Sequence, residues 1–255
     1  MDFVKMEGLG NDFVVIDGPV EMKPERVRRW CDRRFGIGAD GVLEITQLGG
    51  DRIGMRYWNA DGSEAEMCGN GLRCLARLAA DRAWVDPGKI TIATAMGDMP
   101  AQVLADGMVR ALVGTPVVAG PPVDLAATVH RISVGNPHAV VFVDDPAETD
   151  VATIGPQIEQ DALFPDRSNV EFVAIEDGSD IRMRVWERGV GETLASGSGA
   201  AAAAFAAATY RGVTPPVTVS LPGGRLVIEL GDGEAWMIGP GNVVFEGRVD
   251  VTDLG

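Results

Sequence analysis

GMRYWNADGSEAEMCGNG at residues 54–71 and RMRVWERGVGETLASGSG at residues 182–199 are the stretches that indicate the fold. They lie 128 positions apart in a chain of 255 residues, and six of their eighteen positions are identical. A second pair follows the same order: GNDFVV at 10–15 and GNPHAV at 135–140 each join a Gly-Asn turn to a segment of strand character. The repetition predicts an internal duplication, and chance recurrence of common turn dipeptides is the alternative.

The fold class expected from this repeat is α+β, with several strands and one principal helix in each half. A helix from about Gly199 to Gly212 is apolar on every face, so it must be buried all round, which a curled, mostly antiparallel sheet wrapped around it would achieve. Its first-half counterpart at 72–84 has Arg73 and Arg77 on one stripe, and we expect that side to touch solvent or a partner. Strands are expected at 52–58, 89–93 and 103–113 in the first half, and at 131–134, 139–143, 170–175, 181–186 and 217–221 in the second.

The segment GTPVVAGPP at residues 114–122 is predicted to separate the halves, because its three prolines and two glycines are typical of domain boundaries. The expected domains are therefore an N-terminal half at 1–115 and a C-terminal half at 116–244. An additional helix is predicted at 24–34, because proline suits its first position and Val27, Trp30 and Cys31 share one face.

Composition excludes several classes of function. Lys and Arg total 22 against 37 Asp and Glu, so the net charge of −15 disfavours nucleic acid and anionic membranes as partners. The longest uncharged apolar stretch, at 199–210, has 12 residues, fewer than the roughly 20 of a spanning helix. The first residues do not resemble a secretion signal, so a cytoplasmic location is expected. Three cysteines and two histidines are too few for a disulfide framework or a zinc set, and no metal is expected.

Cys68 is the first candidate for chemistry, because the run GNG at 69–71 follows it and opens a helix. A helix N-terminus favours a thiolate, and its first amides bind a carboxylate or an oxyanion, although a small capping residue in a Gly turn would look the same. The second half repeats the design with Ser196 in place of the cysteine. Two such helix ends suggest that they bind one carboxylate ligand together. One group would remove the proton from the α-carbon of this ligand, and the other would return a proton to the opposite face, which inverts the carbon. This chemistry would need no metal and no pyridoxal cofactor.

Six signature segments run through essentially the whole chain. They are KMEGLGNDFVVID (5–17), FGIGADGVL (35–43), NADGSEAEMCGNGLRC (59–74), GNPHAV (135–140), SNVEFV (168–173) and ERGVGETLASGSGA (187–200). With these segments the sequence resembles the diaminopimelate epimerases, cofactor-independent enzymes that interconvert L,L- and meso-diaminopimelate. The resemblance implies two similar halves, each a curled sheet around a central helix, a strand at 245–255 that returns to the first half, and a homodimer.

The resemblance also implies roles for individual residues. Cys68 would be one of two acid/base groups, and Ser196 occupies the position of the other. The amide donors to the reacting carboxylate would be Gly69, Asn70, Gly197 and Ser198, and the residues that hold the distal amino acid end would be Asn11, Asn59, Asn136, Asn169, Glu187 and Arg188. These side chains suit that task, because arginine grips a carboxylate bidentately and a glutamate neutralises an ammonium. His138 is expected to order the site rather than to carry the proton.

Ser196 departs from the family pattern, which has a second catalytic cysteine there. A serine hydroxyl is a far weaker acid than a thiol, whose pKa is about 8.5, and it is a poor base unless another base adjoins it. Slowed or absent turnover is therefore expected. Three explanations stay open: a substitution made to slow turnover, a natural variant that transfers the proton by a different route, and a non-catalytic carboxylate-binding paralogue. A racemase or dehydratase for another amino acid, such as a proline derivative, is a further alternative. Cys31 and Cys74 are expected in the core.

Overall fold

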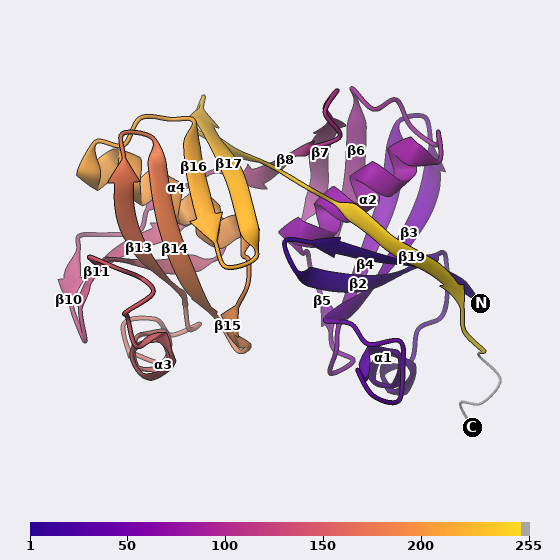
Figure 1. Ribbon diagram of the computed structural model, residues 1–255, viewed down its shortest axis with the longest axis horizontal. Coiled ribbons are helices and arrows are strands. Elements are labelled where there is room, and N and C mark those ends of the chain that lie inside the picture. The colour runs from indigo at the N-terminus through magenta and orange to yellow at the C-terminus, as the bar shows by residue number, and fades with distance from the viewer. Residues whose placement is uncertain (251–255) are drawn as a thin grey trace. The chain divides into compact units, whose positions relative to one another are not determined.

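The computed structural model describes residues 1–250 and divides the chain into two compact units (Figure 1). Unit 1 comprises Met1–Ala111 together with the chain from Gly239 onward, and unit 2 comprises Leu112–Ile238. Strand β19 (Asn242–Arg248) pairs with β1 (Asp2–Gly8), so the chain does return to unit 1. The end of the predicted returning strand, at 251–255, lies outside the described residues.

Unit 1 contains one strongly curled sheet in the order β19, β1, β2, β3, β4, β6, β7, β8. Neighbouring strands are antiparallel except in two pairs, β2 with β3 and β4 with β6. The short β5 pairs with the end of β4. The bounds are β2 (Asn11–Asp17), β3 (Gly41–Gly49), β4 (Arg52–Asn59), β5 (Glu64–Ala65), β6 (Ile90–Thr94), β7 (Gly97–Val103) and β8 (Val109–Gly114).

Unit 2 repeats this topology strand for strand, from β11 to β18. Its two parallel pairs, β12 with β13 and β14 with β16, fall at the same places in the order. The repeated topology confirms the expected fold class and supports the duplication. The bounds are β9 (Val117–Val118), β10 (Val123–Asp124), β11 (Thr128–Ser133), β12 (Pro137–Phe142), β13 (Asn169–Asp177), β14 (Asp180–Glu187), β15 (Gly191–Thr193), β16 (Val217–Leu221), β17 (Gly224–Gly231) and β18 (Glu234–Gly239).

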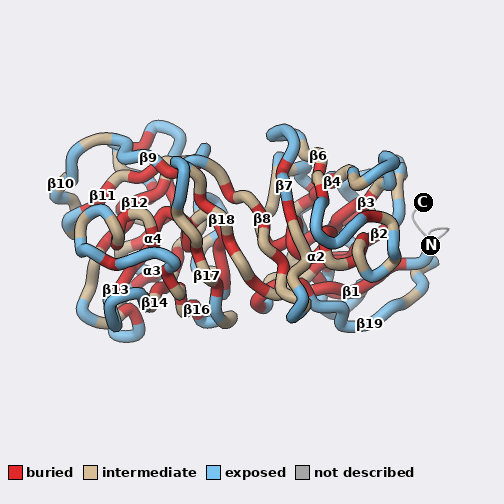
Figure 2. Tube along the Cα trace, turned by 90° about the horizontal axis from the view of Figure 1, so that it is seen from above, coloured by how far each residue is buried: buried red, intermediate tan, exposed pale blue. Residues whose placement is uncertain are grey.

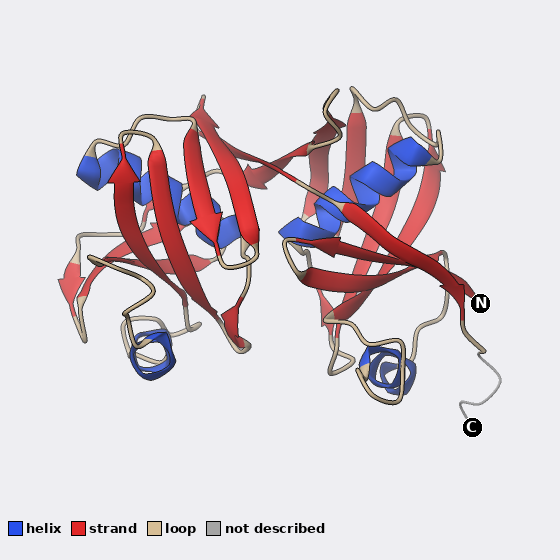
Figure 3. Ribbon diagram, in the orientation of Figure 1, coloured by secondary structure: helices blue, strands red, loops and turns tan. Residues whose placement is uncertain are grey.

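A central helix lies against the sheet in each unit, α2 (Gly69–Asp81) in unit 1 and α4 (Gly197–Arg211) in unit 2 (Figure 3). Most of α4 is buried, as its apolar faces predict (Figure 2). Its alanines suit this position, because they favour helix formation and allow strands to approach closely. The helix ends at Gly212, whose φ of 72° is the left-handed conformation that glycine adopts most easily. The predicted stop is confirmed.

The arginine stripe of α2 differs from expectation. Arg77 is partly exposed and pairs with Asp81, but Arg73 is 0% exposed, so the expectation that this side touches solvent or a partner is wrong for Arg73. Its Nε atom donates to the carbonyl of Pro240 at 2.9 Å, and its Nη2 atom lies 3.1 Å from where a Cβ at Gly8 would be. Contacts with residues far away in the sequence, Gly8 and Pro240, therefore bury this guanidinium.

Two shorter helices complete the units. Helix α1 (Pro24–Cys31) buries Val27, Trp30 and Cys31, which confirms the predicted apolar face, and it ends three residues before the predicted limit. Helix α3 (Val151–Glu159) begins at Asp150, whose side chain accepts a hydrogen bond from the amide of Thr153. None of the described helices has the length and apolar character needed to cross a membrane.

Candidate active site

Cys68 and Ser196 have almost the same backbone conformation at the starts of α2 and α4. Cys68 has φ −138° and ψ 118°, and Ser196 has φ −137° and ψ 120°. Both are the N-cap residue, so the amides that follow precede the first hydrogen bonds within each helix and are placed to bind an anion. These amides include the four predicted donors Gly69, Asn70, Gly197 and Ser198.

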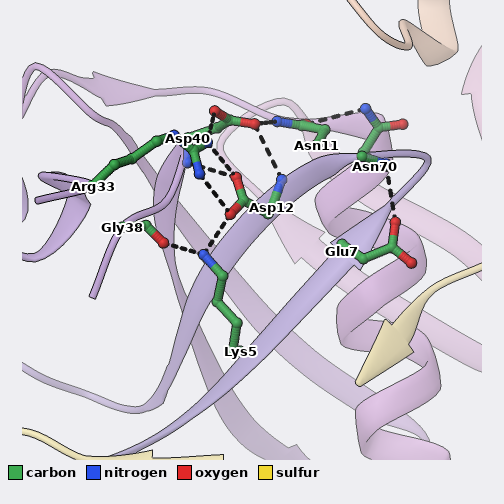
Figure 4. A network of polar contacts seen from close by, with 9 residues as sticks. Lys5, Glu7, Asn11, Asp12, Arg33, Gly38, Asp40 and Asn70 are labelled. Atoms are coloured by element: carbon green, nitrogen blue, oxygen red, sulfur yellow. Dashed lines mark hydrogen bonds and ion pairs between the residues drawn. The ribbon is translucent and has the colours of Figure 1, made fainter. Parts of the chain in front are cut away.

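The thiol of Cys68 belongs to a hydrogen-bonded group in unit 1. Its Sγ atom donates to Oδ1 of Asn11 at 3.7 Å, and Nδ2 of Asn70 donates to the same oxygen at 3.1 Å. Figure 4 shows Asn11 and Asn70 side by side. The structure therefore brings together three of the predicted residues, Asn11, Cys68 and Asn70.

Asn59 is the last residue of β4 and has other hydrogen-bond partners than this group. Its amide side chain donates to the hydroxyl of Ser63 at 3.0 Å, and its backbone amide donates to the carbonyl of the same residue at 2.9 Å. Asp61 accepts hydrogen bonds from both the hydroxyl and the amide of Ser63. The turn after β4 is thus held by its own polar groups, and the side chain of Asn59 has a fixed place in it.

Ser196 in unit 2 has a carboxylate beside its hydroxyl. The hydroxyl accepts from the amide of Gly199 at 3.2 Å. It also lowers the pKa of the nearby carboxylate of Glu187, which accepts a hydrogen bond from Thr193. Burial raises the pKa of Glu187, and the hydrogen bonds from Thr193 and Ser196 offset part of that rise. A serine hydroxyl is a poor proton acceptor unless another base lies beside it, and Glu187 is placed to be that base.

A buried pair of titratable groups, His138 and Glu171, lies in the same unit. Both side chains are 0% exposed, and Nδ1 of His138 lies 2.7 Å from Oε1 of Glu171. The other ring nitrogen of His138 lies 3.0 Å from Oδ1 of Asn136, so the pair holds a predicted ligand residue. Burial raises the pKa of Glu171, and the charge and hydrogen bond of His138 lower it in part. Glu171 was not among the predicted site residues, although a carboxylate between the apolar residues Val170 and Phe172 was a signal.

The loop after β14 carries Arg188 and is held from two sides. The amide of Arg188 donates to Oδ1 of Asn169 at 3.0 Å, and its Nη1 atom donates to the carbonyl of Asp166 at 3.1 Å. On the other side, the carboxylate of Glu159 accepts from the amide of Gly189 at 2.8 Å. The predicted residues Asn169 and Arg188 are therefore in contact, and Glu159, which was not predicted from the sequence, supports the loop.

A cavity of about 290 Å³ opens in unit 2 beside Asn136 and His138. Arg131 and Arg167 also line it, so cationic and hydrogen-bonding groups face the same space. Its volume is slightly below the range of roughly 300 to 1,000 Å³ typical of ligand sites. These groups and this size suit a small polar ligand or part of one.

The other two cysteines lie in the core, as expected. Burial raises the pKa of both Cys31 and Cys74 to about 12, so their thiols stay protonated at neutral pH. Cys68 is partly exposed and differs from them in this respect. Among the described residues, no three His, Cys, Asp or Glu side chains are grouped so as to hold a metal ion.

Comparison with solved structures gives the same fold. A hydroxyproline epimerase from Agrobacterium vitis matches with a TM-score of 0.75 at 14% sequence identity, over 100% of this chain and 93% of that one. A phenazine biosynthesis protein of the PhzF family from Enterococcus faecalis also has a TM-score of 0.75, at 12% identity, over 98% of this chain and 99% of that one. At these identities the likeness concerns the fold alone.

Sequence comparison gives the family. The model of the diaminopimelate epimerase family matches residues 3–119 and 131–245. The diaminopimelate epimerase of Alkalilimnicola ehrlichii is 44% identical, over 97% of this chain and 98% of the relative. That of Desulfitobacterium hafniense is 41% identical, over 97% of each. The chain therefore belongs to the diaminopimelate epimerase family.

Proposed function

We propose that the chain is a cofactor-independent epimerase that interconverts L,L- and meso-diaminopimelate, with Cys68 and residue 196 as its two proton-transfer groups. The observation that carries the proposal is the matching backbone conformation of Cys68 and Ser196 at two helix starts. Inversion needs a base on one face of the α-carbon and an acid on the other, and two equivalent positions suit that need. The relatives named above support diaminopimelate as the substrate.

The helix starts supply the stabilisation that the reaction needs. Removal of the α-proton makes the substrate carboxylate enediolate-like, so negative charge accumulates on its oxygens. Backbone amides at a helix N-terminus stabilise this charge more strongly in the transition state than in the ground state. We assign this task to the amides of Gly69 and Asn70 in α2 and of Gly197 and Ser198 in α4.

We assign the distal amino acid end of the substrate to six side chains. Asparagines offer donors and acceptors, and the guanidinium of Arg188 suits a carboxylate. Glu187, which the resemblance assigns to the distal ammonium, also hydrogen-bonds Ser196. The full set is Asn11, Asn59, Asn136, Asn169, Glu187 and Arg188.

The proximity of Glu187 to Ser196 favours a natural variant that transfers the proton by a different route. In that account the α-proton moves to the hydroxyl oxygen of Ser196 while the hydroxyl proton moves to the carboxylate of Glu187. The thiol of Cys68 gives its proton to the opposite face of the α-carbon and becomes a thiolate, so atoms and charges balance and the centre is inverted. A carboxylate whose pKa is raised by burial is a stronger base than an ordinary glutamate, which helps this relay.

Exchange of the α-proton with solvent tests the proposed function. Incubation of L,L-diaminopimelate with the protein in heavy water should remove the α-proton signal and produce the meso isomer. Binding without any exchange would instead show a carboxylate-binding paralogue. Faster turnover of proline derivatives than of diaminopimelate would show a related racemase or dehydratase.

We also propose that the protein works as a homodimer through β19. Val243, Val244 and Phe245 on this strand are 46%, 55% and 47% exposed, an unusual apolar surface for a strand. Strands of this kind invite pairing with another chain. Light scattering should give about twice 26.9 kDa, and Val244→Lys should give a folded monomer. A monomeric wild type at micromolar concentration would contradict the proposal.

A further inference from the structure

Four charged side chains of unit 1, which we call the Asp12–Asp40 cluster, surround one end of β2 (Figure 4). Lys5 forms an ion pair with Asp12 at 2.6 Å, and Arg33 pairs with Asp12 at 2.7 Å and with Asp40 at 2.6 Å. Burial alone would raise the pKa of Asp12, but hydrogen bonds from Arg33 and Lys5 lower it to about 2. Asp12 is therefore ionised at neutral pH, and two positive charges balance two negative ones.

Asp40 fixes the orientation of the Asn11 amide. Its Oδ2 atom accepts from Nδ2 of Asn11 at 2.9 Å and from the backbone amide of Asp12 at 3.1 Å. An ionised carboxylate only accepts hydrogen bonds, so the nitrogen of Asn11 must face Asp40. The oxygen of Asn11 then points the other way, toward the thiol of Cys68.

Arg73 fixes the next amide in the same sense. Its Nη2 atom donates to Oδ1 of Asn70 at 2.9 Å, and a guanidinium only donates, so the nitrogen of Asn70 must face Asn11. The result is a chain that runs from Asp40 through Asn11 and Asn70 to Arg73. An acceptor ends it on one side and a donor on the other, and such chains polarise and strengthen their members. This also explains why a buried arginine lies at the start of α2.

We propose that Asp40 is a positioning residue for Cys68, which acts by holding Asn11 so that its amide oxygen faces the thiol. An oxygen acceptor favours the protonated thiol over the thiolate, so Cys68 is kept with its proton ready for donation. Asp40 affects catalysis in this way only if Cys68 transfers a proton, so this part rests on the proposed function. Its effect on the thiol is a separate property, which is measured without substrate.

The experiment is the alkylation of Cys68 by iodoacetamide as a function of pH, with the modified peptide quantified by mass spectrometry. In Asp40→Ala the Asn11 amide loses one of the two contacts that fix its orientation, since only the hydrogen bond from Asn70 remains, and its nitrogen can then face the sulfur in part of the molecules. The pKa of the thiol should then fall by about 0.5 to 1 unit, the size expected for one net hydrogen bond. The rate of α-proton exchange from diaminopimelate should fall by about 10- to 100-fold, because Asn11 no longer orients the thiol of Cys68. Glu7 of β1 and Arg73 of α2, the other charges near this end of the helix, are unchanged in the variant.

Asp98→Ala is the matched control, because Asp98 is also half-exposed and paired with an arginine in unit 1. It should leave the thiol titration unchanged. If Asp40→Ala does not fold, Asp40→Asn retains one acceptor oxygen and should show a smaller shift in the same direction. An unchanged thiol titration in the folded Asp40 variant would overturn the proposal.

A double-mutant cycle with Asn11→Ala shows whether Asp40 acts through Asn11. On that background, Asp40→Ala should shift the thiol pKa by less than half as much as in the wild type. An equal shift on both backgrounds would mean that Asp40 acts by its charge alone, and it would overturn the proposal. A clear thiol shift in a protein without any α-proton exchange would instead keep this inference and contradict the proposed function.

Discussion

Ser196→Cys is expected to raise the rate of α-proton exchange from diaminopimelate by about 10²- to 10⁴-fold. One positioned acid or base is typically worth that factor, provided that its pKa is near the working pH. A thiol starts at a pKa of about 8.5, whereas the end of α4 contributes at most about 2 kcal/mol, or roughly 1.5 pKa units, which is too little to tune a serine hydroxyl. The rate is measured by the loss of the α-proton signal in heavy water.

Two further variants complete this test. Cys68→Ala should abolish exchange both in the starting protein and on the Ser196→Cys background, because it removes the other proton-transfer group. Ser220→Cys is the control for a new thiol elsewhere in unit 2, on β16, and it should leave the rate unchanged. If Ser196→Cys leaves the rate unchanged or lowers it, Ser196 with Glu187 already transfers the proton as well as a thiol would, or the protein binds its ligand without turnover.

The repeat made much of the fold predictable, because its matched positions lie on the same elements of the two units, β4 with β14 and α2 with α4. The strand predicted at 52–58 is β4 (Arg52–Asn59), and its partner at 181–186 is β14 (Asp180–Glu187). The single strand predicted at 103–113 is wrong, since a turn separates β7 from β8. Gly107, with φ 84°, donates to the carbonyl of Leu104 at 2.9 Å, and the Asp-Gly pair at 106–107 was a readable turn signal.

Helix α3 shows where local pattern is insufficient. Gly155 and Pro156 inside it are residues that normally argue against a helix. A Cβ at Gly155 would lie 2.7 Å from Cγ of Trp186, so the glycine allows close packing of α3 on β14. That requirement comes from a contact 31 positions along the chain and is not visible in the helix itself.

The candidate site also has features that the sequence predicts and features that it does not. The positions of Cys68 and Ser196 follow from the repeat, because the two Gly-x-Gly runs start equivalent helices. The burial of Arg73 does not, since the carbonyl of Pro240 that it binds is 167 positions away. The pairing of Glu171 with His138 also depends on the parallel register of two strands, β12 and β13. Partners of buried charges are set by tertiary packing, which the spacing of residues does not reveal.

Glu187→Gln is expected to lower the rate of α-proton exchange by the Ser196 form by about 10²-fold or more, because the amide cannot accept the hydroxyl proton. Burial raises the pKa of Glu187, so its ionised form, which is the base, appears only at a higher pH than for an ordinary glutamate. Exchange by the Ser196 form should therefore rise with pH through that raised pKa. Glu187→Gln should remove this rise, which a pH profile of exchange measures.

Glu192→Gln is the control for the loss of a carboxylate from the same hairpin. Glu192 pairs with Arg184 at 2.6 Å on β14, so its removal should leave both the rate and the pH profile close to those of the starting protein. On the Ser196→Cys background, Glu187→Gln should cost less, because a thiol needs less help from a neighbouring base. Equal losses on the two backgrounds would mean that Glu187 binds the distal ammonium and takes no part in the relay. An unchanged pH profile in Glu187→Gln would contradict the relay directly.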